Sequence, residues 1–153
     1  MIRIFRENDA IPLHELICDT IDVSYSGHYP ARAIQFFKDY HSVSNIIERS
    51  KTGVILVCEK DGVVVATGAL TGDEILGVFV RPECQGQGFG RMIMNELESR
   101  AKAHGIRETI LSVSLPSRKF YESLGYAVQE ECSVDVGEGQ CLMYWLGKKE
   151  LIQ

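Results

Sequence analysis

Hydrophobic and polar positions follow two different rhythms along this chain, and the rhythm changes after its first third. Residues 2–6 alternate apolar and charged side chains, which is typical of a half-buried strand. Asp9 can cap a following helix that has one apolar face. The polar, aromatic segment 25–30 interrupts this helix, and a second apolar helix then follows. A further short helix is predicted over residues 44–49.

The middle of the chain changes to short apolar runs separated by turn residues. Three runs of this kind, 54–59, 63–70 and 74–80, predict three strands. Asp61-Gly62 is a two-residue turn that admits positive φ angles, and residues 71–73 form a second turn. The three strands are therefore expected to form an antiparallel meander.

Helical periodicity returns after a cluster of glycines. From Phe89 to Ala101 an apolar residue recurs every four positions, which predicts a helix, and Gly105 occupies the position at which such a helix ends. The remaining predicted elements are a strand over 109–113, a short helix over 117–124, and two strands, 126–136 and 141–146, joined by a glycine turn.

This order, β-α-α-β-β-β-α-β-α-β-β, predicts an α/β (α+β) fold. We expect a mixed, mostly antiparallel sheet of about six to seven strands with helices on both faces. No repeat or linker divides the chain, so residues 1–153 are predicted to form a single domain.

Composition narrows the function classes. The net charge of -5 argues against a nucleic-acid binder, which needs a basic patch. The five cysteines form no C-x-x-C pair, so neither a metal site nor a disulfide framework is predicted. The N-terminus is charged where a signal peptide is apolar, and no apolar run reaches the ~18 residues of a membrane span. We therefore expect a cytoplasmic protein that does not bind membranes.

The glycine cluster is the most informative segment. A strand ends at Val80, the loop Gln85-Gly86-Gln87-Gly88-Phe89-Gly90 follows, and a helix begins. Glycines let the backbone approach an anion closely, and a helix N-terminus adds unpaired N–H groups and a positive dipole end. The segment is therefore predicted to bind a pyrophosphate. It lacks the Gly-Lys-Ser/Thr of a Walker A loop and does not fit the dinucleotide fingerprint G-x-G-x-x-G.

The loop does match the pattern Q/R-x-x-G-x-G/A, and in this respect the chain resembles the GNAT acetyltransferases. A second block, Phe120-Tyr121-Glu122-Ser123-Leu124-Gly125-Tyr126, resembles the F-Y-E-x-L-G-F/Y of that family. With the flanking strands the resemblance covers residues 54–146. It implies an enzyme that transfers an acetyl group from acetyl-CoA to a primary amine by direct attack in a ternary complex. The alternative is a module of the same fold that binds acyl-CoA as a sensor or structural ligand without turnover.

The resemblance also implies where coenzyme A would bind. Backbone groups of Val78 and Val80 would bond the pantetheine arm, and the loop with the first turn of its helix would hold the pyrophosphate. Many members carry an asparagine where this chain has Ser114, which can still donate and accept a hydrogen bond. The predicted cofactor-binding residues are Val78, Phe79, Val80, Gln85, Gly86, Gln87, Gly88, Phe89, Gly90, Arg91 and Ser114.

Two residues are candidates for proton transfer. Tyr121 occupies the position that resembles the general acid of the family, and a phenol can protonate a departing thiolate. Glu74 begins the strand that ends at Val80, and it lies on the same side as Leu76 and Val78. Several family members carry a catalytic glutamate on this strand, so Glu74 is the predicted base, and a water chain is the alternative. The backbone N–H of Phe79 or Val80 could stabilise the oxyanion.

The acceptor is less well defined by the sequence. Tyr25, His28 and Tyr29 lie between the first two helices, a region that shapes the acceptor pocket in the resembled family. The acceptor could be a small molecule, a peptide or a protein, and a homodimer is compatible with the fold. His14, His41 and His104 are interpreted as surface or helix-end residues, and Phe36, Phe37 and Tyr40 as core or interface.

Overall fold

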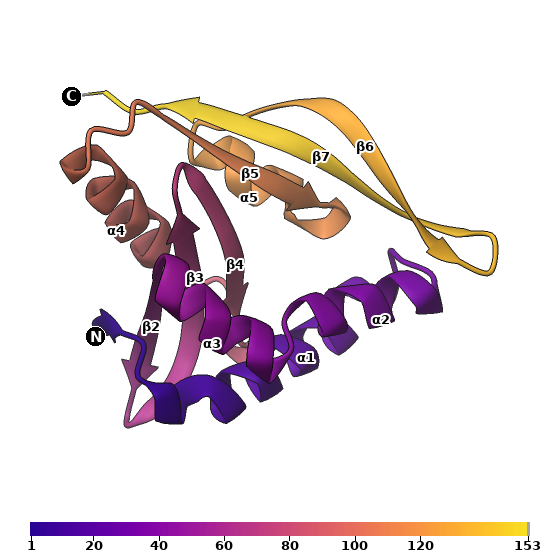
Figure 1. The fold of residues 1–153 in the computed structure, drawn as a ribbon, viewed down its shortest axis with the longest axis horizontal. Helices are drawn as coiled ribbons and strands as arrows, with labels where there is room; N and C mark the ends of the chain where they lie inside the picture. Colours follow the sequence, from indigo (N-terminus) through magenta and orange to yellow (C-terminus); the bar gives the residue numbers. More distant parts are fainter. Residues whose placement is uncertain (153) are drawn as a thin grey trace.

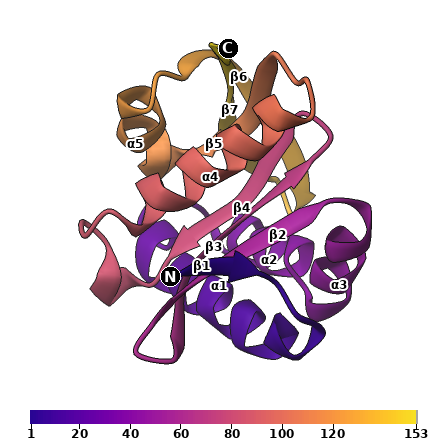
Figure 2. The ribbon, with the colours of Figure 1, turned by 90° about the vertical axis from the view of Figure 1, so that its left-hand side faces the viewer.

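A single seven-stranded sheet separates two layers of helices in the computed structural model, which describes residues 1–152 (Figures 1 and 2). The strands are β1 (Ile2–Ile4), β2 (Val54–Lys60), β3 (Val63–Thr71), β4 (Glu74–Val80), β5 (Glu108–Ser114), β6 (Ala127–Gly137) and β7 (Gln140–Glu150). The helices are α1 (Ala10–Tyr25), α2 (Ala31–Tyr40), α3 (Val43–Thr52), α4 (Phe89–Ala103) and α5 (Arg118–Ser123). This architecture confirms the predicted fold class.

The sheet divides into two parts that separate from each other between β4 and β5. The strand order is β1-β2-β3-β4-β5-β7-β6, and only β4 and β5 are parallel. These two strands pair at a single position, Glu74 opposite Ile110, next to a bond from the Ile110 amide to the Asp73 carbonyl of 3.0 Å. Beyond this point no ladder bond joins them, and Figure 1 shows β5 leaving the direction of β4. The opening between the two strands is where the site lies.

A bulge in β4 changes the direction of its backbone beside this opening. Gly77 and Val78 lie opposite the single residue Gly68 of β3, between the pairs Ala69–Leu76 and Thr67–Phe79. Gly77 has a φ of 63°, a left-handed conformation that favours glycine. A Cβ atom on Gly77 would lie 3.1 Å from the guanidinium of Arg49. The bulge therefore depends on the absence of a side chain.

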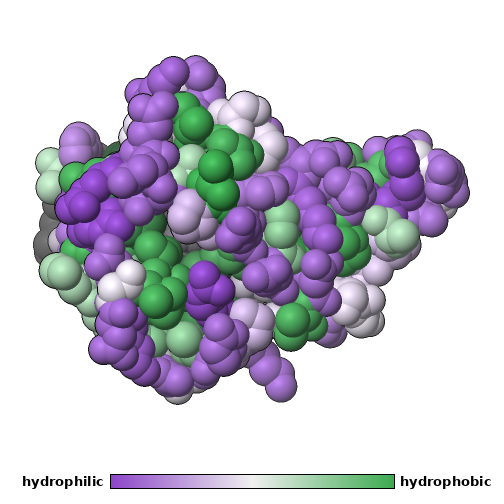
Figure 3. All heavy atoms as spheres, turned by 90° about the horizontal axis from the view of Figure 1, so that it is seen from below, coloured by the Kyte–Doolittle hydropathy of each residue, from purple (hydrophilic) through white to green (hydrophobic). Residues whose placement is uncertain are grey.

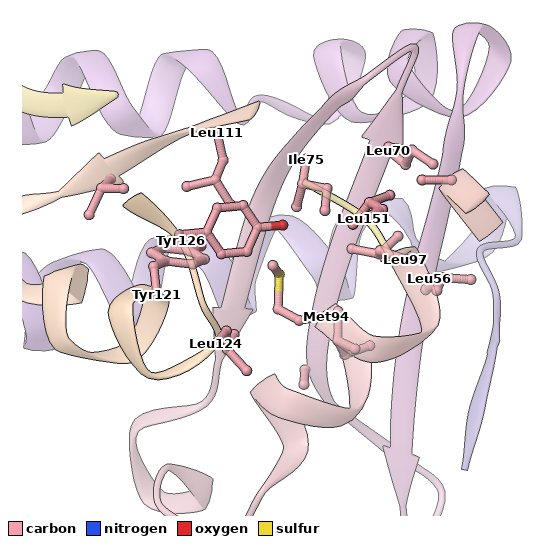
Figure 4. Packing of buried hydrophobic residues seen from close by; sticks show 14 of the residues in the cluster. Leu56, Leu70, Ile75, Met94, Leu97, Leu111, Tyr121, Leu124, Tyr126 and Leu151 are labelled. Atoms are coloured by element: carbon pink, nitrogen blue, oxygen red, sulfur yellow. The ribbon is translucent and has the colours of Figure 1, made fainter. Parts of the chain in front are cut away.

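Alternation along the central strands supplies one hydrophobic core on each face of the sheet. Leu56 and Cys58 of β2 face the core covered by α4 and α5, while Ile55 and Val57 face the core covered by α1, α2 and α3. In Figure 4, Met94 of α4 lies among the buried residues of the first core. Burial of these two apolar layers is the main favourable contribution to folding.

A buried polar cluster connects α4 to the second part of the sheet. The hydroxyl of Tyr126 donates to Glu98 of α4 at 2.9 Å and also bonds the hydroxyl of Thr109 at 2.8 Å. Lys149 of β7 donates to the other oxygen of Glu98, also at 2.8 Å. Every polar atom of this cluster has a partner, so the buried carboxylate is compensated.

The largest differences between the predicted elements and the structure concern three of them. Strand β1 ends at Ile4 instead of Arg6, and α3 is a full helix, so three helices precede β2 where the predicted order had two. Strand β7 continues to Glu150, beyond the predicted end at 146, although residues 147–150 are mostly polar. The reason is that every residue of β5 pairs with β7, from Ser114 opposite Tyr144 to Glu108 opposite Glu150. These backbone bonds keep the polar end of β7 in the sheet.

Hydrophobic side chains reach the surface in several places on the face viewed from the α1 side (Figure 3). Figure 3 shows small hydrophobic patches there among hydrophilic groups. Within residues 1–152, no helix is both long enough and apolar enough to cross a membrane.

Candidate active site

The loop after β4 presents a row of backbone N–H groups. Gly88 is the N-cap of α4 and has a φ of 92°, which turns the chain sharply into the helix. Within residues 1–152, the amides from Gly86 to Arg91 donate to no protein acceptor, and the first helical bond of this segment runs from Met92 to Gly88. Six consecutive N–H groups at the positive end of a helix form a site for an anion such as a diphosphate.

A groove of about 680 Å³ runs along this loop, and we refer to it as the loop groove. It is lined by α1, the end of β4, the glycine loop and α5. Its lining residues are Thr20, Ser24, Tyr25, Val78, Phe79, Val80, Cys84, Gln85, Gly86, Gly88, Phe89, Gly90, Arg91, Pro116, Ser117, Phe120 and Tyr121. The groove therefore leads from the unpaired amides to the opening between β4 and β5.

The backbone of β4 offers hydrogen-bonding groups on the groove side. The amide of Arg81 donates to Val65 of β3 at 2.8 Å, so the amide of Val80, one residue earlier, points away from β3. The Val80 carbonyl on that side accepts from the side chain of Gln85 at 3.1 Å. By the same alternation the Phe79 amide points toward β3. Of the two predicted oxyanion donors, Val80 is therefore the one oriented toward the groove.

A second cavity, of about 260 Å³, lies in the opening between β4 and β5, and we refer to it as the aromatic cavity. Helix α2 and strands β6 and β7 form its other walls. Its lining residues are Tyr25, Phe36, Phe37, Tyr40, His41, Glu74, Ile75, Leu76, Gly77, Val78, Phe79, Ser112, Ser114, Ser117, Tyr121, Val134, Leu142 and Tyr144.

The two cavities meet at residues that line both of them: Tyr25, Val78, Phe79, Ser117 and Tyr121. Burial, together with the nearby phenols of Tyr25 and Tyr126, raises the pKa of Tyr121 far above its usual value of 10.0. Tyr121 is therefore a neutral phenol at physiological pH, and its hydroxyl has no hydrogen-bond partner among residues 1–152. It is a hydrogen-bond donor available to whatever occupies the junction.

Other hydroxyl groups gather around this junction. Ser114 and Ser117 bond each other at 2.6 Å, and both line the aromatic cavity together with Tyr25. Burial raises the pKa of Tyr25, partly offset by these two serines. Ser114 lines the aromatic cavity and not the loop groove, while Ser117 lines both.

The far end of the aromatic cavity holds a carboxylate and a neutral imidazole. Burial and the neighbouring Asp73 raise the pKa of Glu74 above 4.5, an effect that Arg49 partly offsets. Burial, with Arg49 and His14 nearby, lowers the pKa of His41 to about 3. Arg49 donates to Nδ1 of His41 at 3.1 Å, which places the proton of the neutral ring on Nε2.

The structure brings most of the predicted site residues together, but not all. His28 is exposed, and Tyr29 is buried with its hydroxyl bonded to the Met143 carbonyl and the Leu115 amide, so neither lines a cavity. Gln87 also lies outside the groove lining; its side chain accepts from Lys60 at 3.3 Å. Of the three predicted acceptor residues, only Tyr25 lies at the junction.

Several cavity residues were not recognised as such in the sequence. His41 ends α2, as expected, but it is buried instead of lying at the surface. Phe36, Phe37 and Tyr40, interpreted as core or interface, line the aromatic cavity. The spacing of Phe36, Phe37 and Tyr40 places them on adjacent positions of one helix face, a signal compatible with a core face as well as with a cavity wall. No feature of the sequence indicated that Ser117 lines a cavity.

Two cavities that share lining residues are what a two-substrate transferase requires. A model of the acetyltransferase (GNAT) family matches residues 13–126. The chain therefore belongs to the GNAT acetyltransferase family, which confirms the resemblance inferred from the loop and from the Tyr121 block. A search of curated proteins finds no match to the chain.

Solved structures of low sequence identity share the fold. A GCN5-related N-acetyltransferase from Rhodopseudomonas palustris is 21% identical with a TM-score of 0.90, over 99% of this chain and 95% of that one. The PaiA N-acetyltransferase from Thermoplasma acidophilum, in complex with coenzyme A, is 22% identical with a TM-score of 0.81 over 98% of both chains. The putative acetyltransferase YncA from Salmonella typhimurium, with acetyl-CoA, is 20% identical with a TM-score of 0.73, over 100% of this chain and 94% of that one. The predicted co-substrate agrees with these two complexes.

Proposed function

We propose that this protein transfers the acetyl group of acetyl-CoA to a primary amine, with the donor in the loop groove and the acceptor in the aromatic cavity. The observation that supports this most strongly is the junction itself, where a buried phenol without a protein partner faces both cavities. A donor lying along the groove would bring its thioester to this junction, since the six unpaired amides suit the diphosphate at the other end.

The reaction needs one bond to form, one to break and one proton to move. The amine nitrogen would attack the acyl carbon, the C–S bond would break, the nitrogen would lose a proton and the sulfur would gain one. The Val80 amide would stabilise the oxyanion, because it points toward the groove. Tyr121 would donate to the sulfur as negative charge develops there.

Glu74 is the proposed base, acting through water. Glu74 and Val78 are four positions apart on β4, which in a regular strand corresponds to roughly 13 Å between their Cα atoms. This distance exceeds the direct reach of the Glu74 side chain, so a chain of waters would carry the proton from the junction. Support for Glu74 comes from its place in the aromatic cavity and from burial, which raises its pKa toward the range of a useful base.

The test is turnover with a chemically broad panel of primary amines. We expect thiol release from acetyl-CoA that depends on an amine, together with the mass of the acetylated product. Binding of coenzyme A without any amine-dependent thiol release would contradict catalysis and favour the sensor alternative.

A further inference from the structure

The aromatic cavity has a composition that restricts the acceptor, if the proposed function holds. Eight of its eighteen lining residues carry rings, contributed by α1, α2, β4, α5 and β7 as well as by His41. Phe36 and Tyr40 are 40% and 45% exposed although they are large aromatic residues. Their place on the cavity lining explains this exposure, because a bound apolar group would cover them.

The charges of the lining residues also restrict which acceptors can bind. Glu74 is the only Asp, Glu, Lys or Arg among the lining residues in the described part of the chain. Arg49, which is not a lining residue, lies next to Gly77, and it donates to His41 at 3.1 Å and to the Tyr40 carbonyl at 3.3 Å. An acceptor with its own carboxylate would meet Glu74 with no lining cation to pair with.

Among the described residues, the lining of the aromatic cavity also offers no carboxylate to pair with a second ammonium group on the acceptor. The one lining carboxylate is the proposed base, which takes up the proton of the reacting amine. Another ammonium group inside the cavity would lose its hydration without a carboxylate partner. Two of the polar groups near the junction, Ser114 and Ser117, already bond each other at 2.6 Å, so they offer less to a polyhydroxylated acceptor.

The volume sets the size of the acceptor. A cavity of about 150 Å³ lined by apolar side chains accommodates one benzene molecule. The aromatic cavity, at about 260 Å³, is large enough for one ring and a short aminoalkyl chain, and too small to enclose two or three linked sugar rings.

We infer that the aromatic cavity selects an arylalkylamine: a primary amine on a short chain that carries one uncharged aromatic ring and no carboxylate. The ring would pack among the side chains from α2 and β7, and the amine would reach the junction beside Tyr121. This inference rests on the proposed function and adds the class of acceptor to it.

The test compares two amines that differ by a single group. 2-Phenylethylamine and phenylalanine share the ring and the chain, and only phenylalanine has a carboxylate. We expect kcat/KM to favour 2-phenylethylamine by at least about 100-fold, since like charges in one cavity cost several kcal/mol. 1,4-Diaminobutane and kanamycin, which represent diamines and aminoglycosides, should be at least tenfold poorer than 2-phenylethylamine.

A variant pair locates the selection in the cavity. Phe36→Ser should raise KM for 2-phenylethylamine several-fold and leave KM for acetyl-CoA unchanged. Val23→Ser, on an exposed residue of α1 outside both cavities, is the control and should change neither.

The outcomes separate the two proposals. Equal or better turnover of phenylalanine, the diamine or the aminoglycoside would overturn the arylalkylamine inference and leave the proposed function intact. Acetyl-CoA binding with no amine acetylated would overturn both.

Discussion

At the scale of single residues, the two proton-transfer candidates differ in how their surroundings prepare them. Tyr121 is buried among aromatic rings with a raised pKa, which keeps it a neutral donor. Glu74 is partly buried beside Asp73, and its pKa is also raised. A carboxylate with a raised pKa binds a proton more readily than an ordinary one, which suits a base. The raised pKa of Tyr121 keeps its hydroxyl protonated as a hydrogen-bond donor to the sulfur, but it also makes the phenol a weaker acid.

Tyr121→Phe removes one hydroxyl and keeps the ring that packs against Phe120 and Tyr126. We expect kcat to fall by about 100-fold or more, with KM for acetyl-CoA nearly unchanged, because the donor acts on the departing sulfur. Tyr126→Phe is the matched control. The hydroxyl of Tyr126 bonds Glu98 away from the junction, so its removal should lower stability and leave kcat unchanged. Unchanged kcat in Tyr121→Phe would remove the residue from the mechanism.

The pH dependence of kcat/KM tests Glu74. A base must be unprotonated to work, so activity is lost as pH falls through its pKa, and burial places that acidic limb above pH 4.5. Glu74→Gln should lower kcat/KM and abolish this limb. The acceptor amine also titrates, so the pH profile is measured with two acceptors of different pKa. If the acidic limb of the profile moves with the pKa of the acceptor and is still present in Glu74→Gln, Glu74 is excluded as the base.

At the scale of elements, the bulge of β4 positions the groups that face the groove. It inserts Gly77 and Val78 opposite one residue of β3, just before Phe79 and Val80. Residues 74–80 were predicted as a strand from their apolar pattern, but the pattern could not locate the bulge. A glycine inside a strand is the one signal that indicates such a bulge, and Gly77 carried it.

Gly77→Ala tests whether the bulge matters for function. A side chain at a φ of 63° costs roughly 1–2 kcal/mol of stability, and this Cβ would also press on Arg49. Gly72→Ala is the control, because Gly72 has a φ of 59° and no atom within 4 Å of its Cβ position. Both variants should lose stability in urea unfolding, but only Gly77→Ala should also lower kcat/KM several-fold; equal kinetics in the two would contradict a role for the bulge.

The elements themselves were more predictable than the cavity they enclose. Periodicity and turn residues identified every strand, because local patterns report which face of an element is buried. The glycine loop was recognised because its chemistry lies in consecutive residues. The residues that line the aromatic cavity are spread along the chain from Tyr25 to Tyr144. Which of their side chains face the cavity and which are covered by neighbouring elements depends on the divergence of β4 and β5. No local pattern encodes that divergence, so the burial of His41 was missed.

At the scale of the whole molecule, the two parts of the sheet are connected by few backbone bonds. Because β4 and β5 pair only at Glu74 and Ile110, side chains carry much of the connection. Glu98 of α4 reaches Lys149 of β7 on one face. On the other face the hydroxyl of Tyr29 donates to the Met143 carbonyl at 2.7 Å and accepts from the Leu115 amide at 2.9 Å.

Tyr29→Phe should loosen the second part of the sheet. Loss of the hydroxyl leaves a buried amide and a carbonyl without their partner, which costs about 1–3 kcal/mol. We expect a lower unfolding free energy and faster hydrogen exchange at Leu115 and along β7. Tyr40→Phe, at an exposed residue whose hydroxyl bonds no group in residues 1–152, is the control. Equal exchange in both variants would show that Tyr29 does not connect the two parts.

The most direct measurement is calorimetric titration with coenzyme A and, separately, with pantetheine. Pantetheine keeps the thiol and both amides but lacks the diphosphate together with the 3′-phosphoadenosine, so the comparison measures how much the phosphate-bearing end of coenzyme A, expected at the amides from Gly86 to Arg91, adds to binding. The account predicts that coenzyme A binds with a single site per chain and that pantetheine binds at least about 100-fold more weakly. Equal affinity for the two ligands, or no heat with coenzyme A, would contradict it.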